Sequence, residues 1–376
     1  MGDKQSKLDR LLKALNHTEG DRVPAGDFFW SGFARRCQAK WGEGFDPYRH
    51  FDLDYVVVNP NMDPHIQPFE IVERTDQDVV VKTGFGATIR RRGDLPMPSY
   101  EAFSVNDAAE MADFGFDDPA DPRRFFEGGD DQINCVGDVL LRDIPSWDER
   151  VSAYVDDFPV FGSICEPHEY LWRVIGSENT LFWMAAEPGR LKAFIDRIGT
   201  FVRDLTEAEI EAGRGRLSGM YVWGDVAYVR GMLFGAPRWR ELFKPHVKAL
   251  IDLCHSHDLP VVYHGCGDAR EIFDDMVELK LDGYNPLEAK AGIDVVALKP
   301  KYAGKLAFVG NIDIRVLETN NPETIRREVR YKLQAARGGG WVFQSDHSVS
   351  SQVAPESYAL AIDTLRAEGT YPLGDL

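Results

Sequence analysis

Leu259-Pro-Val-Val-Tyr-His-Gly-Cys-Gly267 is a short apolar run that leads directly into a histidine, a cysteine and two glycines. His264 and Cys266 are separated by one residue, so both side chains point to the same side of an extended backbone. Imidazole nitrogen and thiolate sulfur together suit zinc. The alternative is a buried strand end with a structural histidine and an inert thiol, because cysteine is often buried for packing alone. The pair by itself leaves both interpretations open.

Eight short strands are predicted along the chain, each followed by a helix or a long loop. The strands are expected near residues 25–29, 53–59, 159–164, 219–223, 260–264, 283–285, 306–310 and 341–343. Helices are expected over residues 167–175, 187–213, 237–257, 269–279, 293–300, 322–336 and 355–368, and an amphipathic helix precedes the first strand. Eight such units predict a (β/α)8 TIM-type barrel, because parallel strands need crossover helices and a barrel leaves no exposed edge. A doubly wound open sheet is the runner-up, disfavoured because no glycine-rich GxGxxG loop opens the first unit.

Two segments fall outside the repeating pattern. Residues 78–90 alternate apolar and polar side chains around glycines, which predicts a β-hairpin excursion at about residues 70–95. Residues from about 100 to 150 are acidic and rich in proline and aspartate, which is typical of a long, partly irregular insertion. We expect residues 1–376 to form one barrel domain that carries both segments.

The composition limits the classes of function. The chain has 376 residues, 44% of them hydrophobic, and can bury a large core. A formal net charge of -18 argues against nucleic acid or an acidic membrane surface as a partner. The five cysteines are odd in number and widely scattered, so no disulfide framework is expected. With no signal-type apolar core and no membrane-spanning run, we expect a cytoplasmic location.

Polar residues follow nearly every predicted strand. In a barrel of this type, residues just beyond the carboxyl ends of the strands converge on one mouth. These residues are Glu166, Asp225, His264, Cys266, Asn285, Asn311, Asp313, Asp346 and His347. Each acid alone would be expected as a solvated loop residue or a helix cap, but as a set they favour a functional site. Asn285, Asn311 and Asp313 are candidates for substrate binding.

A catalytic zinc needs three protein ligands and an open position, and His264 and Cys266 supply two. We expect His347 as the third ligand. Asp346 is the alternative, or it orients an imidazole ligand by a hydrogen bond without binding the metal itself. The remaining alternatives are Glu166 and Asp225. Four aromatic residues near the mouth are candidates for substrate contact, although packing at the barrel end accounts for them equally well: Phe28, Phe29, Trp30 and Trp223.

Seven segments, in order along the chain, resemble the uroporphyrinogen decarboxylase superfamily, in particular its branch of zinc-dependent, corrinoid-linked methyltransferases. They are Leu171-Trp-Arg-Val-Ile-Gly-Ser-Glu178, Trp223-Gly-Asp-Val226, Trp239-Arg-Glu-Leu-Phe-Lys-Pro245, His264-Gly-Cys-Gly267, Asp282-Gly-Tyr-Asn-Pro-Leu-Glu288, Phe308-Val-Gly-Asn-Ile-Asp313 and Gly338-Gly-Gly-Trp-Val-Phe-Gln-Ser-Asp-His347. The fold that this resemblance implies is the same barrel. In the methyltransferase branch, zinc is held by a His-x-Cys pair and a further cysteine near the last strand. His264 and Cys266 match the pair, whereas His347 stands at the last-strand position.

The decarboxylase branch carries an arginine-rich loop after the first strand, where this chain has Asp27-Phe-Phe-Trp30. The resemblance therefore implies a zinc-dependent methyltransferase, in which Asp225 or Glu166 handles a proton or occupies the fourth zinc position. The methyl group of a small-molecule ether, amine or thiol would pass to or from a corrinoid on a separate protein. Tetrahydrofolate or a thiol is the alternative carrier, and a homodimer is one option for the assembly. A metal-free decarboxylase or lyase and a non-catalytic ligand-binding barrel are the competing hypotheses.

Overall fold

Seven parallel strands curl into a barrel in the computed structural model, which describes residues 3–92, 97–135 and 144–375. In spatial order they are β1 (Val56–Val57), β6 (Val160–Cys165), β7 (Leu217–Trp223), β10 (Val261–His264), β11 (Gly283–Asn285), β12 (Ala307–Val309) and β13 (Trp341–Val342). Each neighbouring pair is parallel. The carboxyl ends of these strands therefore face one mouth, as the predicted topology requires.

Residues 24–26 close the barrel, because they hydrogen-bond to both edges of the seven-stranded sheet. The amide of Gly26 donates to the carbonyl of Phe343 at 3.0 Å, and the amide of Asp54 donates to the carbonyl of Ala25 at 2.7 Å. Phe343 follows β13 and Asp54 precedes β1, so this segment takes the place of an eighth strand. The predicted (β/α)8 barrel is confirmed, although the strand predicted at residues 25–29 is reduced to isolated bridges at Ala25 and Phe29.

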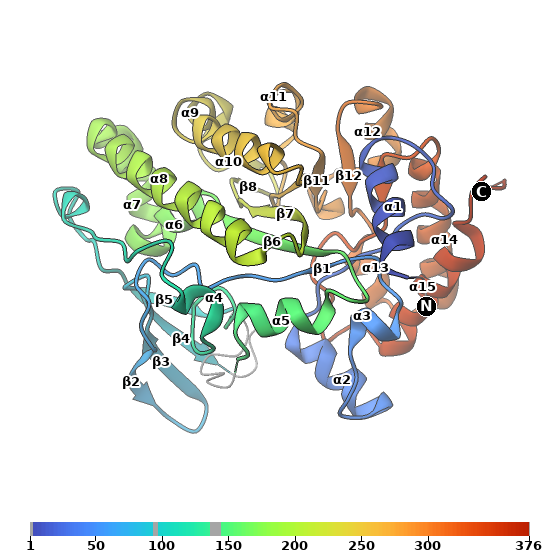
Figure 1. Cartoon of the computed structure of the whole chain (residues 1–376), viewed down its shortest axis with the longest axis horizontal. Coiled ribbons are helices and arrows are strands. Elements are labelled where there is room, and N and C mark those ends of the chain that lie inside the picture. Colours follow the sequence, from blue (N-terminus) through green and yellow to red (C-terminus); the bar gives the residue numbers. More distant parts are fainter. Residues whose placement is uncertain (1–2, 93–96, 136–143, 376) are drawn as a thin grey trace.

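Besides its strands, the described part of the chain contains α-helices, most of which cover the outside of the barrel (Figure 1). They are α1 (Lys4–Leu15), α2 (Ser31–Trp41), α3 (Pro47–His50), α4 (Arg123–Phe126), α5 (Trp147–Tyr154), α6 (Pro167–Ile175), α7 (Ser177–Ala186), α8 (Pro188–Gly213), α9 (Gly235–Leu242), α10 (Lys244–Ser256), α11 (Phe273–Glu278), α12 (Val295–Tyr302), α13 (Ile314–Glu318), α14 (Pro322–Leu333) and α15 (Pro355–Glu368), with 3-10 turns η1 (Glu110–Ala112), η2 (Arg270–Ile272), η3 (Ala289–Ala291) and η4 (Gln334–Ala336). Among the described helices, none is long and apolar enough to cross a membrane.

One predicted helix is wrong in its extent. The single helix expected over residues 237–257 is two helices, α9 and α10, which meet at Phe243. Pro245 lies in the first turn of α10, where its missing amide hydrogen costs nothing, but inside one long helix it would remove a hydrogen bond. A short hairpin of β8 (Ala227–Tyr228) and β9 (Gly231–Met232), which the sequence did not predict, precedes α9.

The predicted hairpin excursion is a four-stranded antiparallel sheet. Its strands are β2 (Glu70–Arg74), β3 (Asp78–Lys82), β4 (Thr88–Arg92) and β5 (Ser99–Ala102). One face packs Val81 and Ile89 against Phe69 and Cys135 in a small core of its own. The sheet lies at one end of the molecule, away from α14 and α15 (Figure 1).

Helix α1 covers the amino-terminal end of the barrel. Its buried residues Leu11 and Leu15 pack with Val262 and Val342, which point into the barrel from β10 and β13. The amide of Gly340, just before β13, donates to the carbonyl of Ala14 at 2.8 Å. This end is therefore filled, which leaves the opposite end as the mouth.

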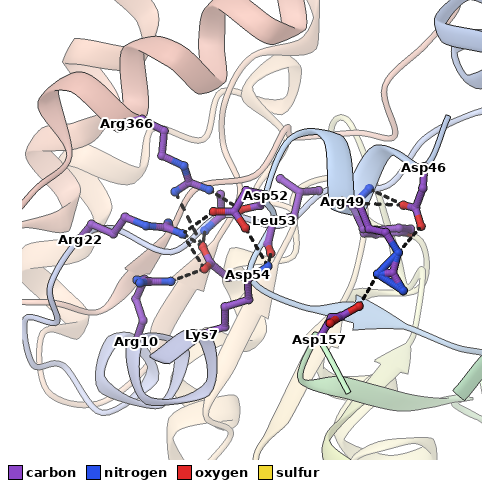
Figure 2. Close-up of polar contacts among 12 residues, drawn as sticks. Lys7, Arg10, Arg22, Asp46, Arg49, Asp52, Leu53, Asp54, Asp157 and Arg366 are labelled. Atoms are coloured by element: carbon purple, nitrogen blue, oxygen red, sulfur yellow. Dashed lines mark hydrogen bonds and ion pairs between the residues drawn. The ribbon is translucent and has the colours of Figure 1, made fainter. Parts of the chain in front are cut away.

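A buried ionic network ties α1 to the place where the barrel closes (Figure 2). Asp54 is fully buried and accepts from Arg10 at 2.5 Å and from Arg22 at 2.9 Å. Its Oδ2 also accepts from the amide of Ala25 at 2.7 Å. Arg366 on α15 lies 3.9 Å from the same carboxylate. Asp54 therefore joins the first and last elements of the barrel.

Candidate metal centre at the mouth of the barrel

Strand alternation directs His264 into the barrel mouth. Val262 packs with the residues that fill the barrel interior, so His264, two residues further along β10, points to the same side. Trp223 at the end of β7 lies against the imidazole, with ring centroids 5.0 Å apart in an edge-to-face arrangement, and Phe28 packs on Trp223 at 5.3 Å. The histidine thus stands beside an aromatic wall.

Three ligand atoms converge at this point. The His264 Nε2 and Cys266 Sγ atoms are 3.4 Å apart, and His264 Nε2 is 3.8 Å from Asp225 Oδ1. Asp225, His264 and Cys266 are the group of metal-ligand residue types whose donor atoms all lie within 4.8 Å of one another in the described part of the chain. A tetrahedral ion with bonds of about 2.0–2.3 Å needs ligand atoms about 3.3–3.8 Å apart, so the donor set fits zinc.

Asn285 fixes the orientation of the imidazole. The Asn285 Oδ1 atom lies 2.5 Å from His264 Nδ1, and the Asn285 amide nitrogen donates to the carbonyl of Val309 at 2.9 Å. Because the amide oxygen can only accept, Nδ1 carries the proton and the Nε2 lone pair faces Cys266 and Asp225. Asn285, a candidate for substrate binding from the sequence, is fully buried and holds the histidine.

The electrostatics of the site favour a cation. Burial raises the pKa of the Cys266 thiol well above its usual value, and the carboxylates of Asp225 and Glu288 raise it further. The pKa of Asp225 is raised as well, because surrounding protein atoms partly desolvate its carboxylate and the charge of Glu169 adds to this effect, whereas His264 opposes it. A positive ion between these groups would stabilise both the thiolate and the carboxylate. The side chain of Asp225 is 48% exposed, so the site is open to solvent.

Glu169 and Arg173 complete the site and were missed by the sequence analysis. Both lie on α6 with side chains only 5% and 9% exposed, and Arg173 binds one Glu169 oxygen. The other oxygen, Oε1, accepts from the backbone amide of Asp225 at 2.9 Å. Two signals in the sequence could have found the pair. Glu169 and Arg173 are four residues apart, as in an ion pair on a helix. Their neighbours are apolar, which indicates a buried face: Tyr170, Leu171, Val174 and Ile175.

Glu166 points away from the barrel interior. It follows Ile164 on the side of β6 that packs against the helices, whereas Phe161 packs with the interior residues. A Cβ atom placed on Gly224 would lie 2.8 Å from the Glu166 Cγ and 2.1 Å from the Tyr263 hydroxyl, so these three residues pack tightly behind β7. Both carboxyl oxygens of Glu166 are buried with no hydrogen-bond partner among the described residues, and burial raises its pKa well above the usual value.

The two residues predicted at the last strand have other contacts. The carboxylate of Asp346 accepts from the amides of Ala289 and Ile314, both at 2.8 Å, and its pKa is raised to about 7 by burial, which these bonds oppose. His347 stacks on Trp30 with ring centroids 6.1 Å apart, outside the group of three ligand atoms. A role for either as the third ligand stays a prediction.

The other predicted substrate residues bind the chain itself. The Asn311 Oδ1 atom accepts from the Val295 amide and from Lys332, and its amide nitrogen donates to the carbonyls of Leu287 and Ile293. Asp313 accepts from the amide of Arg315 at the start of α13. The Phe29 ring packs among Phe33, Tyr48, Phe51 and Tyr358. Of the aromatic candidates, Trp223 and Phe28 are the ones beside His264.

Comparison with known proteins identifies the family. The model of the uroporphyrinogen decarboxylase (URO-D) family matches residues 149–368, more than half of the chain, so the chain belongs to this family. A uroporphyrinogen decarboxylase of Aliivibrio salmonicida is 26% identical over 184 residues, which are 48% of this chain and 50% of that protein. The corresponding enzyme of Citrifermentans bemidjiense is 28% identical over 191 residues, again covering 48% and 50%. The chain thus spans about half the length of the curated relatives it matches.

Among solved structures, a methyltransferase from Methanosarcina mazei is similar over nearly the whole chain. The match covers 96% of this chain and 98% of that protein, with a TM-score of 0.66 and 16% sequence identity. This likeness extends the shared fold beyond the region that the family model matches.

Proposed function

We propose that this protein is a zinc-dependent methyltransferase that moves a methyl group between a small molecule and a carrier. The convergence of Asp225, His264 and Cys266 within 4.8 Å carries the proposal, because this donor set and spacing suit a catalytic zinc. Membership of the URO-D family and the fold shared with the Methanosarcina mazei methyltransferase support it. Three protein ligands leave a fourth position for the substrate.

The chain's own residues hold and orient the reacting groups. Zinc, when bound, acts as a Lewis acid that stabilises a thiolate or an alkoxide at neutral pH. Asn285 keeps the His264 Nε2 lone pair directed at the site, and the Asp225 Oδ1 atom accepts from the Cys266 amide at 2.9 Å, which holds the thiol-bearing loop. Phe28 and Trp223 form an apolar wall beside the site that excludes water from one side of a substrate.

A separate carrier is part of the proposal. The methyl group would pass to or from a corrinoid on another protein, with tetrahydrofolate or a thiol as the alternative. The half-exposed Asp225 leaves the site within reach of such a partner. All five cysteines are free thiols, in keeping with a reducing cytoplasm.

Decarboxylation of a porphyrinogen is the second candidate, favoured by the curated relatives, which are uroporphyrinogen decarboxylases. Zinc analysis separates the two candidates. We expect about one zinc per chain in protein purified without chelator, and loss of most of it in Cys266→Ser. Transfer of a methyl group from a panel of methyl ethers, amines and thiols to free cob(I)alamin, prepared with a chemical reductant, should require that zinc. Metal-free protein that decarboxylates a porphyrinogen would establish the second candidate instead.

A further inference from the structure

We infer that Glu169 is a positioning residue, whose carboxylate holds the backbone of Asp225 and so keeps this third ligand directed at His264 and Cys266. The inference rests on the proposed metal site. Glu169 itself lies on α6 and offers no atom to the group of three ligands. Its effect on a bound ion would pass through Asp225.

The contacts form one continuous chain from α6 to the ligands. Arg173 donates to one oxygen of Glu169, and the other oxygen accepts from the Asp225 amide at 2.9 Å. The Asp225 carboxylate in turn accepts from the Cys266 amide at 2.9 Å and lies 3.8 Å from the His264 imidazole. A shift of the Asp225 backbone would therefore displace one ligand and release the loop that bears another.

Glu169 adds a contact to the turn that follows β7. The amide of Gly224 donates to the carbonyl of His264 at 2.8 Å, and the hydroxyl of Tyr263 donates to the carbonyl of Gly224 at 3.0 Å. These bonds hold Gly224 against β10. The bond from the Asp225 amide to Glu169 ties the next residue of the turn to α6, a different element of the barrel.

A buried carboxylate at position 169 lowers the stability of the folded state. Glu169 is 4% exposed and lies close to another acid, Asp225, whose pKa its charge raises. The buried Arg173 offsets that charge, yet an apolar pair of similar volume often stabilises a protein as well as a buried ion pair does. What an apolar pair lacks is an oxygen that accepts from the Asp225 amide.

Two double variants test this acceptor directly. Glu169→Gln with Arg173→Met removes the ion pair but keeps an oxygen for the Asp225 amide, whereas Glu169→Met with Arg173→Met removes the oxygen as well. Glu209→Gln, a change at a buried glutamate on α8 outside the ion site, is the matched control. Zinc affinity is measured by competition with a chelating dye, and the ligand set is followed by the visible spectrum of the cobalt(II)-loaded protein.

We expect the Met/Met variant to bind zinc about 10–100-fold more weakly than the parent, with the altered cobalt spectrum of Asp225→Ala. The Gln/Met variant and Glu209→Gln should keep the parental affinity and spectrum. Equal behaviour of the two double variants would overturn the role of Glu169, while a parent that binds no zinc would reject the metal site itself. If the Met/Met variant unfolds, Glu169→Asp, which shortens the acceptor, must weaken zinc binding by about 10-fold, and parental affinity overturns the inference.

Discussion

At the scale of single residues, each ligand of the proposed metal site is fixed by a different neighbour. Asn285 holds His264, the amide of Cys266 is held by Asp225, and Asp225 is held by Glu169. Such supporting contacts reduce the freedom that the ligands lose on binding an ion. His347, in contrast, has a 3.5 Å contact from Nδ1 to the carbonyl of Ser348 and stacks on Trp30.

Substitution of the two candidate third ligands distinguishes them. Asp225→Ala removes a donor atom 3.8 Å from His264 Nε2 and should weaken zinc binding by about 100-fold or more, whereas His347→Ala should change it by less than about threefold. Dye competition on both variants gives the comparison. If His347→Ala weakened zinc binding more than Asp225→Ala does, His347 would be the third ligand instead.

The His264 and Cys266 pair could be predicted from the sequence because two side chains separated by one residue point to the same side of an extended segment. The proposed third ligand, Asp225, could not be singled out among the alternatives, because it follows the neighbouring strand β7 and its direction depends on Glu169, a contact across 56 residues. Its position just after a predicted strand led us to expect Glu166 at the mouth of the barrel. The side of the sheet to which it points depends on the register of β6, which the sequence does not specify.

At the scale of elements, a buried acid joins α8 to β6. The Glu209 Oε1 atom accepts from the indole of Trp147 at 3.0 Å and from the amide of Ser163 at 3.1 Å. Glu209 is fully buried, and burial raises its pKa well above the ordinary value of 4.5, although both hydrogen bonds oppose the change. The folded protein therefore keeps a proton on Glu209 that the unfolded chain releases above about pH 4.5.

This proton makes stability depend on pH. Since the folded pKa lies above the unfolded one, the contribution of Glu209 is complete below about pH 4.5 and declines as the pH rises, by at most about 1.4 kcal/mol per pH unit. Glu209→Gln keeps the acceptor oxygen without the proton. Its free energy of unfolding, measured with urea between pH 5 and 8, should therefore fall less steeply than that of the parent. If the free energies of unfolding of parent and variant changed with pH in parallel, Glu209 would not be the group that holds this proton.

At the scale of the whole molecule, the barrel closes where the chain begins. Residues 24–26 make few backbone hydrogen bonds to the two edge strands. The closure of the barrel at this seam therefore depends on the network around Asp54, which joins α1, Arg22 and the start of β1 (Figure 2). The alternation of strands and helices was sufficient to predict a closed barrel. The isolated bridges that close the barrel could not be predicted from the sequence, because they pair residues more than 300 positions apart.

Asp54→Asn tests how much the network at this seam contributes to the free energy of unfolding. The substitution leaves Arg10 and Arg22 with a neutral partner in a buried place and should lower the free energy of unfolding by about 3 kcal/mol. Asp157→Asn is the matched control, because Asp157 pairs with Arg49 at the surface with a side chain 58% exposed (Figure 2) and should cost less than about 1 kcal/mol. Urea unfolding of the two variants measures the difference. Equal losses would mean that the closure of the barrel does not depend on the buried network, and the strand pairing alone would then have to hold the seam.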